Sequence, residues 1–119
     1  MNQSDLPAVR QLVANGAFSI SDHAYSQMLD RKIDYDDVEG VLSSSTNQIV
    51  ECQSPSANLA CPHTDERVLI YDPCYPKEII VIVVALLIPA PEIRVITAMY
   101  IDNGIWTKKP GQIPALVRK

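Results

Sequence analysis

Segment 19–34 contains residues whose types and spacing could carry out chemistry. His23, one of two histidines in the chain, follows polar residues that can cap a helix. At about 100° per residue, His23, Gln27 and Arg31 fall on one stripe of the predicted helix. An imidazole titrates near neutral pH and a guanidinium is a permanent cation, so this combination suits the handling of a phosphate group.

A structural interpretation of the same segment stays open. His23 can be a surface residue near the helix N-terminus, and Arg31 can stabilise the helix through its dipole. An apolar face beside the stripe must hold the helix against a core. The predicted members of that face are Ala24, Tyr25, Met28 and Leu29.

Length and composition predict one folded domain. The chain has 119 residues, of which 47 % are hydrophobic and 20 % are charged, and these values are typical of a globular protein. The net charge of −4 does not indicate a dedicated nucleic-acid-binding protein, because such proteins usually carry net positive charge. A local basic patch is still compatible with this balance.

Cysteine usage and the N-terminal residues predict a cytoplasmic location. The three cysteines are an odd number, and the N-terminus lacks the basic and apolar regions of a signal peptide. The apolar run 79–88 has about half the ~20 residues that a membrane-spanning helix needs. Its β-branched residues favour a strand buried on both faces, so we expect no membrane association.

Local signals in the first 46 residues predict three helices. Their bounds are Ser4 or Asp5 to Asn15-Gly16, Ser21 or Asp22 to about Arg31, and Asp34 to the stretch 43–46. Asp37, three residues after Asp34, gives a weak capping box for the third helix. Residues 18–20 form a short extended piece between the first two helices.

From residue 48 onward the hydrophobic period changes to two, which predicts strands. The predicted strands are Gln48–Cys52, Arg67–Tyr71, Glu78–Ile88 and Glu92–Ile101. Helices followed by strands indicate an α+β fold, in which N-terminal helices pack on an antiparallel four-stranded sheet with run 79–88 inside it. We expect a single domain over 1–119, with its core at about 18–101. Residues 102–119 are a basic C-terminal tail whose charges mainly solubilise the chain end.

The helix-start motif resembles that of a known family. Residues 21–33, Ser21-Asp-His23-Ala24-Tyr-Ser-Gln27-Met28-Leu-Asp30-Arg31-Lys-Ile33, resemble the pattern S-x-H-A-x-x-R-M-x-E-R-x-I of the family called domain of unknown function 4258. An acidic helix start at 36–38, an arginine-led strand at 67–70 and a closing strand at 95–97 extend the resemblance from about Phe18 to Tyr100. The sequence departs from the pattern where Gln27 replaces an arginine and Asp30 replaces a glutamate.

The resemblance carries an implied function. The family is similar to the RelE and BrnT ribonuclease toxins, which share a small α+β fold and cut RNA without a metal. An endoribonuclease of a toxin–antitoxin system is therefore implied, with RNA as substrate, an antitoxin protein as partner and no cofactor. Such cleavage needs a base for the 2′-hydroxyl proton, an acid for the leaving oxygen and cations for the phosphate. The candidate catalytic residues are His23 as base or acid, Arg31, Arg67 and Arg94 as phosphate-binding cations, and Tyr100 as proton donor or stacking partner.

The pattern of the last strand decides which of these residues can meet. Alternation places Arg94 and Tyr100 on one face and Thr97 on the other. Thr97 can join Arg94 only if a β-bulge shifts the register. We expect the five candidate residues to converge on one surface between the His23 helix and the sheet.

A second class of function is a non-catalytic protein-interaction module on the same fold. In this hypothesis the acidic surface and the basic tail bind a protein partner. Gln27 at the position of a motif arginine favours this alternative, because it removes a cation from the stripe that holds His23.

The cysteines raise the question of a metal site. Cys52, Cys61 and Cys74 with His63 supply three thiolates and an imidazole, which is a ligand set for tetrahedral zinc. No pair has the C-x-x-C spacing of a zinc knuckle, and buried free cysteines are common. We therefore expect no metal.

Overall fold

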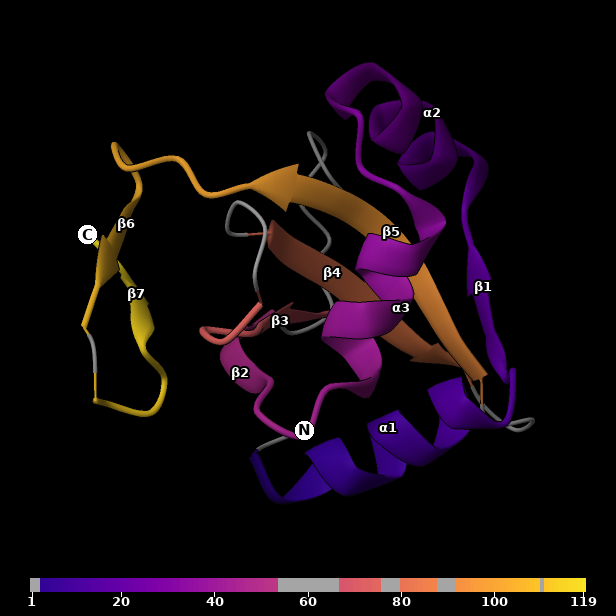
Figure 1. The fold of residues 1–119 in the computed structure, drawn as a ribbon, viewed down its shortest axis with the longest axis horizontal. Helices are drawn as coiled ribbons and strands as arrows, with labels where there is room; N and C mark the ends of the chain where they lie inside the picture. The colour runs from indigo at the N-terminus through magenta and orange to yellow at the C-terminus, as the bar shows by residue number, and fades with distance from the viewer. Residues whose placement is uncertain (1–2, 54–66, 76–79, 88–91, 110) are drawn as a thin grey trace.

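The computed structural model describes residues 3–53, 67–75, 80–87, 92–109 and 111–119 (Figure 1). A short 3-10 helix, Gln3–Asp5, leads into α1 (Leu6–Ala14), and α2 (Asp22–Arg31) and α3 (Tyr35–Ser43) follow. The strands are β1 (Phe18–Ile20), β2 (Gln48–Gln53), β3 (Arg67–Tyr71), β4 (Ile80–Leu87), β5 (Glu92–Tyr100), β6 (Trp106–Lys108) and β7 (Leu116–Arg118). The predicted α+β class is confirmed. None of the helices in these ranges is long and apolar enough to cross a membrane.

The capping residues predicted from the sequence start two of the helices. Ser21 is the N-cap of α2, and its Oγ accepts a hydrogen bond from the backbone N of Ala24 at 3.1 Å. Asp34 and Asp37 form a capping box at the start of α3, where the backbone N of Asp34 donates to Asp37 Oδ2 at 3.0 Å. These bonds satisfy backbone N–H groups that have no partner within a helix, so local sequence defines both helix starts.

The main sheet is mixed and has five strands in the order β1-β5-β4-β3-β2. β1 pairs parallel to β5, with Phe18 opposite Ile93, and the other neighbours are antiparallel. The predicted four-stranded antiparallel sheet is therefore wrong. A three-residue strand is too short to show a period of its own, and its partner lies far along the chain, so only the tertiary fold brings β1 to the sheet.

The core lies between the helices and one face of the sheet, here called the helix face. On β4 this face carries Ile80, Ile82 and Val84, which pack with buried residues of α1, α2 and α3. β4 lies between β3 and β5, which confirms the predicted interior strand for Ile80–Leu87. Ile79 and Ile88, the ends of the predicted run, lie outside the described residues.

The opposite face of the sheet, here called the hairpin face, is partly covered by the C-terminal residues. After β5 the chain turns into β6 and β7, which pair as a small antiparallel sheet (yellow in Figure 1). Trp106 and Leu116 from this hairpin pack against Leu69 and Val81 of the main sheet. The segment expected to be a solubilising tail thus buries apolar surface.

The buried face of α2 is narrower than the sequence predicts. Ala24 and Met28 are buried, but Tyr25 is 56 % exposed and Leu29 is 69 % exposed. The expectation of a core role for Tyr25 and Leu29 is wrong, because α2 packs along β5 at the end of β1 and does not lie across the sheet (Figure 1). Only one narrow stripe of this helix contacts the core.

Candidate functional site

A β-bulge in β5 changes which residues share a face. Thr97 pairs with Val83 and Val95 pairs with the next residue of β4, Val84, so Ile96 is the extra residue. Arg94 and Thr97 both lie on the hairpin face as a result, whereas Tyr100, opposite Ile80, lies on the helix face. The expectation that Arg94 and Tyr100 share a face is therefore wrong, because one added residue inverts the alternation.

The exposed edge of β5 is joined to α2 by polar side chains of the helix. β1 pairs with β5 only as far as Val95, so the following carbonyl groups of β5 need other partners. Ser21 Oγ donates to the carbonyl oxygen of Ile96 at 3.4 Å, and Arg31 Nη1 donates to that of Ala98 at 2.7 Å. These bonds fix α2 beside the sheet.

Arg31 and Tyr100 lie together at the C-terminal end of α2. The hydroxyl of Tyr100 donates to the backbone oxygen of Arg31 at 2.9 Å. The Arg31 guanidinium is held by the strand edge, and neither residue lines the pocket that contains His23. The structure therefore does not bring all five predicted residues to one surface.

His23 belongs to a polar chain of three side chains. Its Nε2 lies 3.0 Å from Gln27 Nε2, and Gln27 Oε1 accepts a hydrogen bond from the hydroxyl of Thr97. With its oxygen directed to Thr97, the Gln27 amide presents its N–H group to the imidazole. Nε2 of His23 accepts this bond in the neutral tautomer that carries its proton on Nδ1. The predicted His23–Gln27 stripe is thus a real contact, which the bulge extends to β5.

A pocket of about 350 Å³ opens between the N-terminal part of α2, the hairpin face and the C-terminal hairpin. Its polar lining comes from His23, Arg67, Thr97 and Arg118. Trp106 lines the pocket together with the apolar residues Leu69, Val83, Ile96, Met99 and Ile105. The structure thus brings together His23 and Arg67, as predicted.

Thr97, Trp106 and Arg118 are lining residues that the sequence analysis did not choose. Arg118 was visible only as a charge in the basic tail, and the hairpin that positions it has no strong local signal. Thr97 was placed on the wrong face because a bulge leaves no mark in the alternation pattern. Arg94 shares the hairpin face but does not line the pocket.

The two arginines of the pocket differ in their electrostatic environment. Arg118 Nη2 lies 2.7 Å from Glu51 Oε2, and its guanidinium stacks 4.7 Å from the centroid of the Trp106 ring. Within the described ranges, Arg67 has no acidic partner. Arg67 is therefore the cation of the pocket whose charge is available to an anion beside His23.

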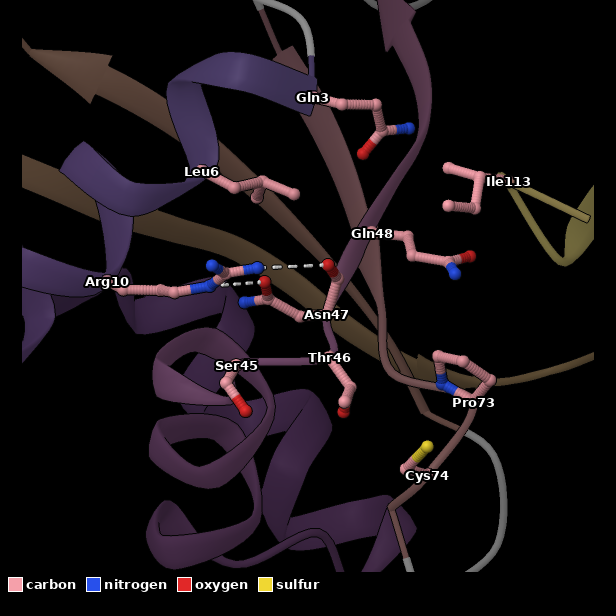
Figure 2. Close-up of a pocket in the computed structure, with 10 residues that line it drawn as sticks. All are labelled: Gln3, Leu6, Arg10, Ser45, Thr46, Asn47, Gln48, Pro73, Cys74 and Ile113. Atoms are coloured by element: carbon pink, nitrogen blue, oxygen red, sulfur yellow. Dashed lines mark hydrogen bonds between the residues drawn. The ribbon is translucent and has the colours of Figure 1, made fainter.

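A second pocket, of about 440 Å³, lies between α1, the start of β2 and the turn after β3 (Figure 2). Its cation, Arg10, donates from Nε to Asn47 Oδ1 at 2.9 Å and from Nη2 to the Asn47 carbonyl at 3.3 Å. Asn47 is buried and donates in turn to the carbonyl oxygens of Val41 and Leu42 at the end of α3. These polar groups hold α1, α3 and β2 together, so this pocket is the weaker candidate.

The proposed zinc ligands do not assemble in the described ranges. Cys52 pairs with Val68 near the start of β3, whereas Cys74 follows the end of that strand. The three residue steps from Val68 to Tyr71 span about 10 Å, so Cys52 and Cys74 lie at opposite ends of β3. Cys61 and His63 lie outside the described residues, and no cluster of metal-ligating side chains is found within them.

Comparison with known families assigns most of the chain to one family. The family described as a domain of unknown function (DUF4258) matches residues 20–100, which are more than half of the chain. The chain belongs to DUF4258. No curated protein and no solved structure matches it.

Most residues of the DUF4258 motif in α2 have a structural role, whereas His23 has none in the described ranges. Ser21 caps the helix, Ala24 and Met28 are buried, and Arg31 holds the β5 edge. His23 is exposed and contacts only another motif position, Gln27, in the described ranges. The DUF4258 match ends at residue 100, so Trp106 and Arg118 add a wall to the pocket from outside the matched range.

Proposed function

We propose that this chain binds RNA at the pocket formed by His23 and Arg67 and cleaves it without a metal ion. One observation supports the proposal best: His23 and Arg67 come from different elements and line one open pocket. An imidazole and a guanidinium in one pocket combine a group that can move a proton with a group that binds phosphate. A distant relationship of the family to the RelE and BrnT toxins, which cut RNA without a metal, is part of this proposal.

In the proposed reaction, His23 removes the proton from a ribose 2′-hydroxyl. The 2′-oxygen then forms a bond to phosphorus while the bond from phosphorus to the 5′-oxygen breaks. The leaving 5′-oxygen takes a proton from water, and the product is a 2′,3′-cyclic phosphate. Arg67 stabilises the charge on the non-bridging oxygens, because a fixed guanidinium needs little reorganisation as that charge develops. For His23 to act as base, Gln27 must release Nε2.

The biological setting forms part of the same proposal. A ribonuclease of this kind acts in the cytoplasm as the toxin of a toxin–antitoxin pair, and an antitoxin protein holds it inactive. A small gene for a DNA-binding antitoxin beside the gene for this chain would support that setting.

A second candidate function is a non-catalytic protein-interaction module. One observation favours it: two polar groups of the pocket are already engaged, since Gln27 occupies His23 Nε2 and Glu51 pairs with Arg118. A pocket with these internal partners can serve recognition without proton transfer. In this case the protein binds a partner and leaves RNA intact.

The test is RNA cleavage by purified protein in the presence of EDTA. We expect wild-type protein to produce fragments that end in a 2′,3′-cyclic phosphate and His23→Ala protein to produce none. The melting temperature should change by no more than a few degrees, because an exposed histidine contributes little to stability. Ser26→Ala, an exposed position on the same helix, is the matched control and should cleave normally.

Induced expression gives the complementary readout. Growth arrest with loss of RNA integrity, both absent with His23→Ala, would support the ribonuclease. Intact RNA in both assays, with normal growth, would remove the enzyme proposal and favour the interaction module.

A further inference from the structure

One row of side chains crosses four neighbouring strands of the main sheet, β1, β5, β4 and β3, at Ala85. The register partners in this row, in the order of the strands, are Ser19, Arg94, Ala85 and Arg67. Directly paired residues project to the same side of a sheet, so the row lies on the hairpin face with Arg67. The neighbours of Ser19 on β1 pack against the core of the helix face, which agrees with this orientation.

The row is positively charged and contains no acidic residue. In the part of the chain that the structure describes, neither Arg67 nor Arg94 forms an ion pair, whereas Arg118 is paired with Glu51. Arg94 is exposed and Arg67 is half-buried. Two arginines that form no ion pair in the described ranges are suited to an anionic ligand, even on a protein with a net charge of −4.

The two arginines are separated only by the methyl group of Ala85. Two steps of about 4.8 Å between neighbouring strands place their Cα atoms about 10 Å apart. Beside Arg94, the hydroxyl of Ser19 is buried and has no hydrogen-bond partner within the described ranges. A guanidinium and a hydroxyl donor therefore stand together on the β5 side of Ala85, next to the pocket.

We propose that Arg94 and Ser19 form a subsite for a second phosphate, next to the phosphate at the His23–Arg67 pocket. Arg67 lines the pocket, whereas Arg94, which precedes the pocket residue Ile96 by two positions on β5, does not line it. A polynucleotide whose first phosphate lies in the pocket supplies a second phosphate to the position beside Arg94. The ligand is then a single-stranded RNA segment that lies across β4 and β5. This inference rests on the proposed binding of RNA and does not require cleavage.

The test compares a ligand with several phosphates and a ligand with one. The first is a 2′-O-methyl hexanucleotide, which lacks the 2′-hydroxyl nucleophile, and the second is uridine 3′-monophosphate. Dissociation constants are measured over a range of salt concentrations for wild type, Arg94→Ala, Arg67→Ala and Ser19→Ala. Lys32→Asn removes one exposed charge at the end of α2 and is the matched control. Asparagine tolerates the left-handed backbone of that residue.

We expect Arg94→Ala to lower the salt slope of hexanucleotide binding by about 0.7, which corresponds to one phosphate contact on a single strand. The affinity of Arg94→Ala for uridine 3′-monophosphate should not change, whereas Arg67→Ala should bind both ligands more weakly. Ser19→Ala should weaken hexanucleotide binding several-fold with the slope unchanged, because no charge is removed. Lys32→Asn should bind both ligands with the affinity of wild type.

Four results would overturn the subsite. An unchanged slope for Arg94→Ala would remove it, as would an equal loss with Lys32→Asn. Weaker binding of the mononucleotide by Arg94→Ala would assign Arg94 to the pocket phosphate. Wild-type protein that binds neither ligand would overturn both the proposed function and this inference, whereas binding without cleavage would overturn only the catalytic part of that function.

Discussion

Arg31 on α2 donates from Nη1 to the carbonyl oxygen of Ala98 on β5 at 2.7 Å. This bond satisfies a backbone group on the part of the β5 edge that β1 does not cover. An arginine that the sequence analysis placed in the site therefore holds the helix that carries the site. We therefore expect its contribution to function to be indirect, through the position of α2.

Replacing Arg31 by alanine should lower the free energy of unfolding and leave RNA cleavage intact. The variant loses a hydrogen bond from a charged donor, and because the residue is exposed we expect a loss of about 1 kcal/mol in the free energy of unfolding. Urea unfolding measures this change. Asp30→Ala, at the neighbouring exposed position, should change it by less than about 0.5 kcal/mol. Unchanged stability with lost RNA cleavage would show instead that Arg31 acts on the substrate.

Replacing Gln27 by arginine should strengthen RNA binding. The new side chain places a cation beside His23 at the pocket edge, where the DUF4258 pattern has an arginine. We expect several-fold tighter binding of single-stranded RNA at low salt and a steeper salt dependence, because one more phosphate contact can form. Gln27→Met is the control, since it removes the amide without adding charge. Equal gains in both variants would mean that release of His23 from the amide, and not the added charge, causes the effect.

Ionisation of the buried Tyr71 hydroxyl should lower the free energy of unfolding at alkaline pH. Burial raises the pKa of Tyr71 from its ordinary value near 10, and Asp72 and Cys74 raise it further. The unfolded chain loses this proton first, so the contribution is fully present below about pH 10 and is lost as the pH rises above it. We expect the free energy of unfolding of wild type to fall more steeply than that of Tyr71→Phe over this alkaline range. Tyr25→Phe, at an exposed tyrosine, should follow wild type, and identical pH profiles for all three proteins would contradict the shift.

The helix starts and the main strands could be predicted from the sequence because their signals are local. Ser21 and Asp34 cap their helices with side chains that act within three residues. The β-branched and aromatic residues of 67–71 and the continuous apolar run behind β4 each report burial along a single strand. These signals also predicted that His23 and Gln27 share one stripe of the helix, and in the structure the two side chains are in contact.

The composition of the site was decided by the tertiary structure. The pairing of β1 with β5, the bulge at Ile96 and the folding of the C-terminal residues onto the sheet all depend on contacts between distant parts of the chain. None leaves a periodic mark in the sequence. The bulge alone moves Tyr100 away from Arg94 and brings Thr97 to Gln27, because one inserted residue inverts the side-chain alternation of everything after it. The sequence by itself therefore determined which helices and main strands form, and that a titratable side chain, His23, lies on one of the helices. The register of the sheet determined which side chains lie beside His23.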